Sequence, residues 1–246
     1  MRRLPLGILV LAAVLGPPSM PAQAGSFTIS PIRLDLSTTV RTAALTVRND
    51  DREALVQADV LLWEQVDGED RLTPTRDLLV SPAVFTLPPK GSQLVRVALR
   101  NPPADSAREL SYRLILQEVP QPANPDFAGL RVMLRLSVPV FVATAGTTGP
   151  ALTWSAAIAG EGLVLTARNA GDIHARIHAF SIAPAAGNEP PLAQPVATYI
   201  LPGQSHSWSL GQKQGEPATG ADWHRLRLRV TTDDGASEIE LDTARE

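Results

Sequence analysis

The chain has 246 residues, a formal net charge of −3 and no cysteine. The slightly negative charge argues against a nucleic-acid-binding protein, because such proteins are usually basic. Without cysteine there are no disulfide bonds, no thiol catalysis and no thiolate metal ligands, so each domain must be stabilised by its own apolar core. This length is typical of two domains of about 100 residues each.

Residues 1–24 have the parts of a secretory signal peptide. Two arginines near the start precede a short apolar run, and the small-residue motif Ala22-Gln23-Ala24 follows. The apolar run is shorter than the roughly 20 residues that a membrane-spanning helix needs. We expect cleavage after Ala24, which leaves 222 of the 246 residues in an exported protein that is not membrane-embedded.

Short runs of alternating apolar and polar residues occupy residues 25–143 and are separated by proline, glycine, asparagine and aspartate. A period of two predicts β-strands, and many short strands at this spacing are typical of an antiparallel sandwich. Asp67-Gly68 predicts a tight hairpin, and Pro88-Pro89 followed by Gly91 predicts a corner. We therefore expect residues 25–143 to form an immunoglobulin-like domain.

The last run of this domain, GLRVMLRLSVPVFV at residues 129–142, is unusually long. Every even-numbered residue from Leu130 to Val142 is apolar, so the segment is predicted to be one strand. Typical strands have about 5–6 residues. A strand of this length has more apolar face than one small sandwich can cover.

Residues 144–150, TAGTTGP, interrupt the alternation and predict a short linker. Further alternating runs follow in residues 151–246, with turns at Asn169-Ala170-Gly171 and Asp234-Gly235, and predict a second β-sandwich. The sequence thus predicts an all-β protein with two immunoglobulin-like domains.

The histidines offer little support for a metal site. All four lie in the second domain, and His174 and His178 are four residues apart. This spacing pairs metal ligands on a helix, but the segment alternates like a strand and lacks the glutamate of an HExxH motif. We expect surface or turn histidines, with no bound metal or other cofactor.

No catalytic constellation is evident either. The chain has no G-x-S-x-G motif, and its first domain has no histidine, so a secreted hydrolase is not expected. The acidic groups beside glycine are expected to be solvated turn residues, not calcium ligands or glycosidase carboxylates. These residues are Asp67, Glu69, Asp70, Asp233 and Asp234. The sequence therefore predicts a protein that is not an enzyme.

Four tryptophans leave two interpretations open. Trp63, Trp154, Trp208 and Trp223 could line a sugar site, or they could pack in the cores or between the domains. A secreted carbohydrate-binding or adhesive β-sandwich protein is therefore the alternative function.

Two arginines lie on predicted strands among apolar neighbours, Arg33 in SPIRLDLS and Arg135 in VMLRLSVP. Charges at such positions usually lie on the solvated face of a sandwich. The pattern alone therefore favours a solvated face over a binding role.

Several of these segments together resemble the PapD-like family of periplasmic pilus-assembly chaperones. They are SPIRLDLS, VRNDD, LPPKGSQLVRV, ELSYRLILQEVP and the long strand. The most specific stretch contains Glu109, Tyr112 and Val119-Pro120, which match the acidic, aromatic and apolar-proline pattern of the family. In the second domain, RNAGDIHA and YILPGQSHSWSL resemble the archaic, Csu-type branch.

The chain departs from the family pattern at three positions. Ile115 lies where the family commonly has asparagine, and Arg135 lies where it has a lysine. Pro139 lies where the family has an arginine that would join Glu109 in an interdomain ion cluster. The packing between the domains is therefore expected to differ from that of the best-known members.

The resemblance implies a non-enzymatic periplasmic chaperone with two domains arranged as a boomerang. Its long strand would be lent to a pilin that lacks its own last strand, an established case of β-augmentation. Leu130, Val132 and Leu134 would then fill the groove of the pilin. Arg33 and Arg135 would hold the C-terminal carboxylate of the pilin, and the complex would be delivered to an outer-membrane usher.

Overall fold

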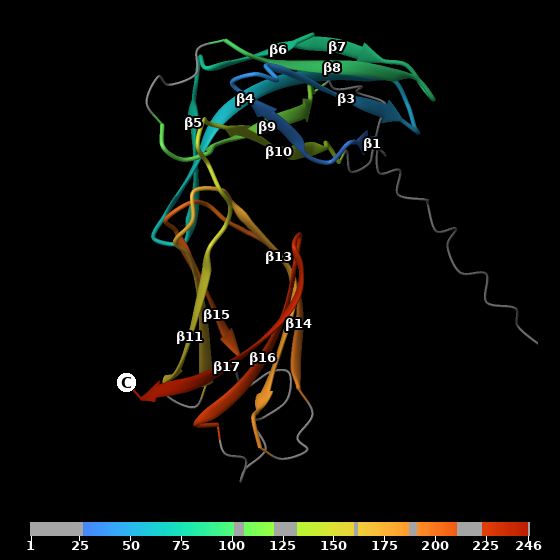
Figure 1. Cartoon of the computed structure of the whole chain (residues 1–246). Coiled ribbons are helices and arrows are strands. Elements are labelled where there is room, and N and C mark those ends of the chain that lie inside the picture. The colour runs from blue at the N-terminus through green and yellow to red at the C-terminus, as the bar shows by residue number, and fades with distance from the viewer. Residues whose placement is uncertain are drawn as a thin grey trace, which may run out of the picture.

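The computed structural model describes residues 27–100, 106–120, 132–159, 162–186, 191–210 and 223–245. The predicted signal peptide lies outside these residues. All the secondary-structure elements of the described part are β-strands, and they form two groups that meet at an angle (Figure 1). The prediction of an all-β protein with two immunoglobulin-like domains in a boomerang arrangement is confirmed.

The first domain consists of two sheets. One has the order β1 (Phe27–Ser30), β3 (Thr42–Asn49), β8 (Ser92–Leu99) and β6 (Leu78–Ser81). The other has the order β2 (Leu34–Ser37), β10 (Arg135–Ala143), β9 (Leu110–Glu118), β4 (Ala54–Val66) and β5 (Glu69–Pro74), and β7 (Val84–Leu87) also pairs with β4. The chain changes sheet between β1 and β2, so β2 lies beside β10.

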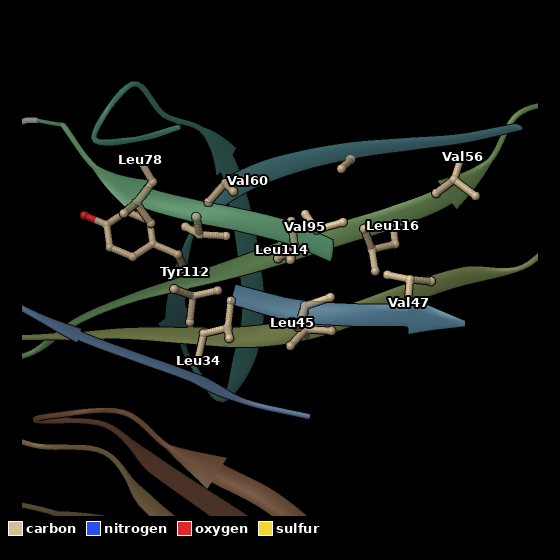
Figure 2. Close-up of a cluster of buried hydrophobic side chains, with 14 of the residues drawn as sticks. Leu34, Leu45, Val47, Val56, Val60, Leu78, Val95, Tyr112, Leu114 and Leu116 are labelled. Atoms are coloured by element: carbon tan, nitrogen blue, oxygen red, sulfur yellow. The ribbon is translucent and has the colours of Figure 1, made fainter. Parts of the chain in front are cut away.

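The core of this domain lies between the two sheets. Leu45, Val47 and Val95 of one sheet face Leu114 and Leu116 of the other (Figure 2), and all five are at most 2% exposed. These residues recur at every second position, as a strand with one buried face requires. The alternation seen in the sequence therefore corresponds to the inward faces of the sandwich.

The predicted hairpin at Asp67-Gly68 is confirmed. Val66 of β4 pairs directly with Glu69 of β5, which leaves a two-residue loop. Asp67 and Gly68 have φ angles of 53° and 81°. Positive φ at both central residues is typical of a type I′ turn, which asparagine or aspartate followed by glycine favours.

The strand predicted over residues 129–142 is shorter in the structure. Strand β10 begins only at Arg135, and residues 132–134 precede it without regular secondary structure. The neighbouring strand β9 ends at Glu118, opposite Leu134, and the next residue, Val119, donates its N–H to Leu55 on the other side. Val132 and Met133, the described residues just upstream of Leu134, therefore have no β9 partner with which to form a ladder.

The second domain is built from one seven-stranded sheet that supplies both layers. Its order is β14 (Leu192–Ile200), β13 (Ala175–Pro184), β16 (Arg225–Thr232), β17 (Gly235–Arg245), β11 (Leu152–Ala159), β12 (Gly162–Asn169) and β15 (Ser205–Leu210). Strand β17 joins the layers, because it pairs antiparallel with β16 and then parallel with β11. Leu165 and Ala167 of β12 pack in one core with Ile177 and Ile182 of β13.

Each domain has a strand that ends in a buried asparagine. Asn49 ends β3 and Asn169 ends β12, and they are 1% and 0% exposed. The Nδ2 atom of Asn49 donates to the carbonyl of Leu87, and that of Asn169 donates to the carbonyl of Ile200. Each amide thus satisfies backbone acceptors at a corner that lies far away in the sequence.

Replacing Asn169 by alanine is expected to lower the free energy of unfolding by about 1–3 kcal/mol, because the carbonyls of Ile173 and Ile200 lose a buried donor. Urea unfolding of the variant and the wild-type protein measures this difference. Thr166→Ala, on the same strand but partly exposed, is the matched control and should change stability by less than about 0.5 kcal/mol. Equal effects of the two variants would contradict a role for the Asn169 amide.

Candidate functional site: an open strand edge and a charged cleft

Strand β10 has an open edge along its first half. It pairs with β9 over Arg135–Val142, whereas on its other side it pairs with β2 only over Val140–Ala143. Within the described part of the chain, no strand covers that other side of residues 135–139. Unpaired N–H and C=O groups at a sheet edge can pair with a strand from another chain.

Pro139 fits the end of this open edge. The N–H of Glu118 donates to the carbonyl of Leu134, and alternate residues of a strand bond to the same neighbour. The backbone groups of Arg135, Ser137 and Pro139 therefore point to the open side. Proline has no N–H, so it is tolerated there without the loss of a ladder hydrogen bond.

The apolar face of β10 continues beyond the core of the first domain. The even-numbered residues in Val138–Val142 are buried in that core, and Leu136 is packed against it. Farther upstream on the same alternation, Leu134 is half-buried and Val132 is 41% exposed. The core of the domain therefore covers this apolar face at Val138–Val142, and the part of the face near Val132 is free to contact a partner.

The predicted donor residues are only partly described. Leu130 lies outside the described residues, whereas on the continuation of β10 Val132 is exposed and Leu134 is half-buried. Glu118 ties this segment to the domain, because its buried carboxylate accepts the N–H of Leu134 at 3.4 Å and forms an ion pair with Arg52 at 3.1 Å. Residues 132–134 are therefore held to the sheet at Leu134.

A charged cleft lies next to the end of the open edge, where the two domains meet. Strand β2 pairs in parallel with β10, and Leu34 lies opposite Val140. One residue earlier on both strands, Arg33 therefore lies beside Pro139. Residues from both domains line the cleft: Pro31, Ile32, Arg33 and Asp35 from the first, and Arg176, His178, Thr232 and Asp233 from the second. A strand of another chain that paired with the open edge of β10 and ended beside Pro139 would therefore end in this cleft.

Arg33 connects the two domains across the cleft. Its Nε donates to Asp35 at 3.1 Å, and its Nη1 donates to Oδ2 of Asp233 at 2.7 Å. The other carboxylate oxygen of Asp233 lies 2.7 Å from Nε2 of His178. Arg33 is one third exposed, so this network can be reached from solvent.

Arg135 is not among the residues that line the cleft in the described part of the chain. Arg135 is exposed at the start of β10, four residues before Pro139. At about 3.3 Å per residue, this separation corresponds to about 13 Å along the strand. Arg33 lies at the cleft end of the open edge and Arg135 at its start, so the joint anchoring role of the two arginines stays a prediction.

At the domain junction Glu109 contacts a histidine, and position 139, where the family has an arginine, is a proline. The carboxylate of Glu109 accepts from the backbone N–H of His174 at 2.9 Å and lies 2.6 Å from its Nδ1. Phe141 of β10 stacks on the His174 ring with centroids 3.5 Å apart. Both Glu109 and His174 side chains are less than 10% exposed, so this contact is a buried part of the domain junction.

An aromatic cluster completes the junction. Trp63 packs against Phe141, Tyr199 and Leu201, and is 2% exposed. The amide of Gln65 donates to the carbonyl of Tyr199 at 2.9 Å and accepts the N–H of Leu201 at 3.0 Å. The end of β4 is thus attached to the second domain by both apolar and polar contacts.

The other tryptophans do not form a sugar-binding surface. Trp208 is 7% exposed and stacks against Trp154 at 6.0 Å, and Trp154 and Trp223 are both packed on the core of the second domain. Of the two interpretations of the tryptophans, packing in the cores and between the domains is therefore correct.

Asp233 was expected to be a solvated turn residue, but it is a member of the cleft network. Partial burial disfavours its charged form, yet hydrogen bonds from Arg33 and His178 outweigh that cost and lower the pKa of Asp233 below its ordinary value. Arg176 also lines the cleft and is not marked by any motif in the sequence. Neither residue is marked by a local pattern, since their roles depend on how the two domains pack.

The lowered pKa of Asp233 predicts a pH-dependent contribution to stability. Because the folded pKa lies below that of the unfolded chain, this contribution is complete above about pH 4 and is lost as the pH falls through the folded value. Asp233→Asn should therefore lower the unfolding free energy at pH 7, by less than about 1 kcal/mol because solvent screens the pair.

Chemical unfolding of this variant and the wild-type protein between pH 7 and pH 2 measures the effect, and the difference should shrink towards the acidic end. Asp234→Asn, in the same turn, is the matched control. A stability difference that does not change with pH would contradict the assigned cause.

The described residues contain no group of three or more histidine, aspartate or glutamate side chains that could hold a metal ion. They also contain no helix long and apolar enough to cross a bilayer.

Comparison with known families identifies the first domain. Residues 26–147 match the family described as pili and flagellar-assembly chaperone, PapD N-terminal domain. A comparison with characterised protein sequences finds no match.

Several solved structures share the fold of nearly the whole chain. A chain of the CsuC–CsuE chaperone–tip subunit pre-assembly complex from the archaic Csu pili of Acinetobacter baumannii has a TM-score of 0.64 at 20% identity, and the match covers 89% of this chain and 99% of that one. A chain of the SafA pilin–SafB chaperone complex of Salmonella enterica has a TM-score of 0.58 at 18% identity, with coverages of 90% and 98%. The CupB2 chaperone of Pseudomonas aeruginosa gives 0.54 at 18% identity, with coverages of 87% and 98%.

The second domain is thus part of the same two-domain architecture as in these chaperones. With its first domain matched by the family model and its whole fold shared, the chain belongs to the PapD-like family of pili and flagellar-assembly chaperones.

Proposed function

We propose that this protein is a periplasmic, non-enzymatic chaperone that binds pilin subunits by donor-strand complementation and delivers them to an outer-membrane usher. The observation that carries the proposal is the open edge of β10 at residues 135–139, with an exposed apolar face immediately upstream. An incomplete pilin needs both features, since its groove lacks apolar side chains and its sheet lacks hydrogen-bonding partners.

The geometry gives the bound strand a direction and an end. Strand β2 pairs parallel with β10 from Val140 onward, so a pilin strand that continued the line of β2 upstream would also run parallel to β10. Its last residue would lie near Pro139, and its terminal carboxylate would face Arg33 in the cleft. In this proposal Leu130, Val132 and Leu134 enter the groove of the pilin, and Arg33 and Arg135 anchor its C-terminus.

The likeness of the fold to a chaperone of the archaic Csu pili, together with RNAGDIHA and YILPGQSHSWSL, supports placing the chain in that branch. Its partners would then be pilin subunits of a Csu-type pilus. The signal peptide predicted at residues 1–24 is consistent with a periplasmic location.

Co-expression tests the proposal. Each small pilin-like subunit encoded beside the gene is expressed in the periplasm of a bacterial host, with and without the tagged chaperone. A true partner should accumulate as a soluble one-to-one complex only in the presence of the chaperone. If every such subunit is equally soluble without the chaperone, and none co-purifies with it, the proposed function is wrong.

A further inference from the structure

In the free protein Arg33 is already paired with a carboxylate of the second domain. Its Nη1 atom donates to Oδ2 of Asp233 at 2.7 Å, in the cleft where we propose that the terminal carboxylate of a pilin binds. Its Nε atom donates at 3.1 Å to Asp35, which lies two residues farther along the chain on β2. Carboxylates of the chain itself therefore occupy this arginine before any partner arrives.

Asp233 presents to Arg33 the same chemical group as the end of a polypeptide chain. It lines the same cleft, and its pKa is lowered although it is partly buried, so it is ionised near neutral pH. Hydrogen bonds between a guanidinium and a carboxylate are charge-assisted and stronger than neutral ones. A pilin carboxylate that approaches Arg33 must therefore compete with an acceptor of its own kind.

Asp233 and Asp35 differ in how easily each releases Arg33. Asp35 and Arg33 belong to one short segment of the first domain, so their contact does not depend on the second domain. Asp233 lies in the turn between β16 and β17 of the second domain, and about one third of each side chain of its pair with Arg33 is exposed. Ion pairs that solvent reaches are weak. Asp233 also keeps a second partner, Nε2 of His178 at 2.7 Å, when it leaves Arg33.

We infer that Asp233 is an internal competitor at the anchor: it holds Arg33 in the free chaperone, and the terminal carboxylate of an arriving pilin displaces it. The inference rests on the proposed chaperone function and leaves the predicted role of Arg135 unchanged. During the exchange Asp35 continues to hold Nε of Arg33, and Asp233 stays with His178.

The exchange replaces one ion pair of Arg33 by another of the same kind. The anchor therefore binds a carboxylate less tightly than an arginine without a partner would, because part of the binding free energy is used to break the pair with Asp233. Such moderated binding suits a chaperone that must later release its pilin.

Two synthetic peptides test the inference. Both have ten residues of alternating valine and threonine after two lysines, and one ends in a free carboxylate and the other in an amide. Isothermal titration calorimetry at pH 7 measures their affinities, and the ratio of the two isolates the contribution of the terminal carboxylate. The wild-type protein should prefer the carboxylate peptide, because only that peptide can form an ion pair with Arg33.

Asp233→Asn should increase this preference about two- to fivefold, since a solvent-accessible ion pair is worth up to about a factor of five in an equilibrium constant. The affinity for the amide peptide should stay the same, which shows that the variant is folded. Asp234→Asn is the matched control. It removes the same charge from the same turn, but Asp234 is not among the described residues that line the cleft, so the preference should not change.

The outcomes separate the inference from the proposed function. If the wild-type protein prefers the carboxylate peptide and Asp233→Asn lowers that preference or leaves it unchanged, Asp233 does not compete for Arg33, and the chaperone function stands. If neither protein distinguishes the peptides, no terminal carboxylate is held at Arg33 and the inference is overturned. A preference that appears only in Asp233→Asn would support it. If neither peptide binds to either protein, pairing at the open edge of β10 is contradicted, and the proposed function fails together with the inference.

Discussion

Replacing Val132 by aspartate is expected to abolish pilin binding while the chaperone remains folded. Val132 is 41% exposed in the free protein, so an aspartate there stays hydrated. In the complex the same side chain would enter an apolar groove, where burying an unpaired carboxylate costs several kcal/mol. The yield of pilin that co-purifies with the tagged variant measures the effect.

Val84→Asp is the matched control for this experiment. Val84 is a valine of strand β7 in the same domain and is 56% exposed, but it lies away from the open edge of β10. The control variant should retain pilin at the wild-type yield, and thermal unfolding should show both variants folded. Normal delivery of the pilin by Val132→Asp would mean that this segment is not the donor.

The second large effect is expected for Arg33→Ala. Removing one partner of a desolvated charge pair costs about 2–5 kcal/mol of binding free energy, and entry of water into the cleft reduces this loss. The free energy of unfolding of the chaperone should change less than the free energy of pilin binding. Arg33 is partly exposed and joins the domains through Asp233, so the variant should lose no more than about 1 kcal/mol of unfolding free energy.

Arg135→Ala is the informative comparison, because the family resemblance implies the same anchoring role for both arginines. We expect this variant also to capture less pilin than the wild-type protein, with little change in its melting temperature. A pilin extended by a few residues at its C-terminus provides the control for the ligand, since its carboxylate is displaced from the cleft. If the extended pilin binds as well as the native one and is equally sensitive to Arg33→Ala, Arg33 does not act through the terminal carboxylate.

The features that could be predicted from the sequence are local ones. The hairpin at Asp67-Gly68 depends on two adjacent residues that tolerate positive φ, and the strands depend on an alternation that spans only a few positions. The apolar face of β10 was predictable for the same reason, because the side chains of a strand alternate between its faces wherever the strand lies. The family resemblance added the donor role of that face.

Where β10 begins was not predictable in this way. The alternation runs through residues 129–142, but the strand starts at Arg135 because its partner β9 ends at Glu118. Strand formation requires a neighbour to complete the ladder, and the length of that neighbour is not encoded in the strand itself.

The composition of the cleft depends still more on tertiary structure. Arg33 and Asp233 are 200 residues apart in the chain, and their contact at 2.7 Å exists only because the two domains pack against each other. Local sequence gave Arg33 and Arg135 equal standing, since both are arginines on apolar strands. The parallel register of β2 and β10 places Arg33 beside Pro139, and the packing of the second domain brings Arg176 of β13 to the same cleft.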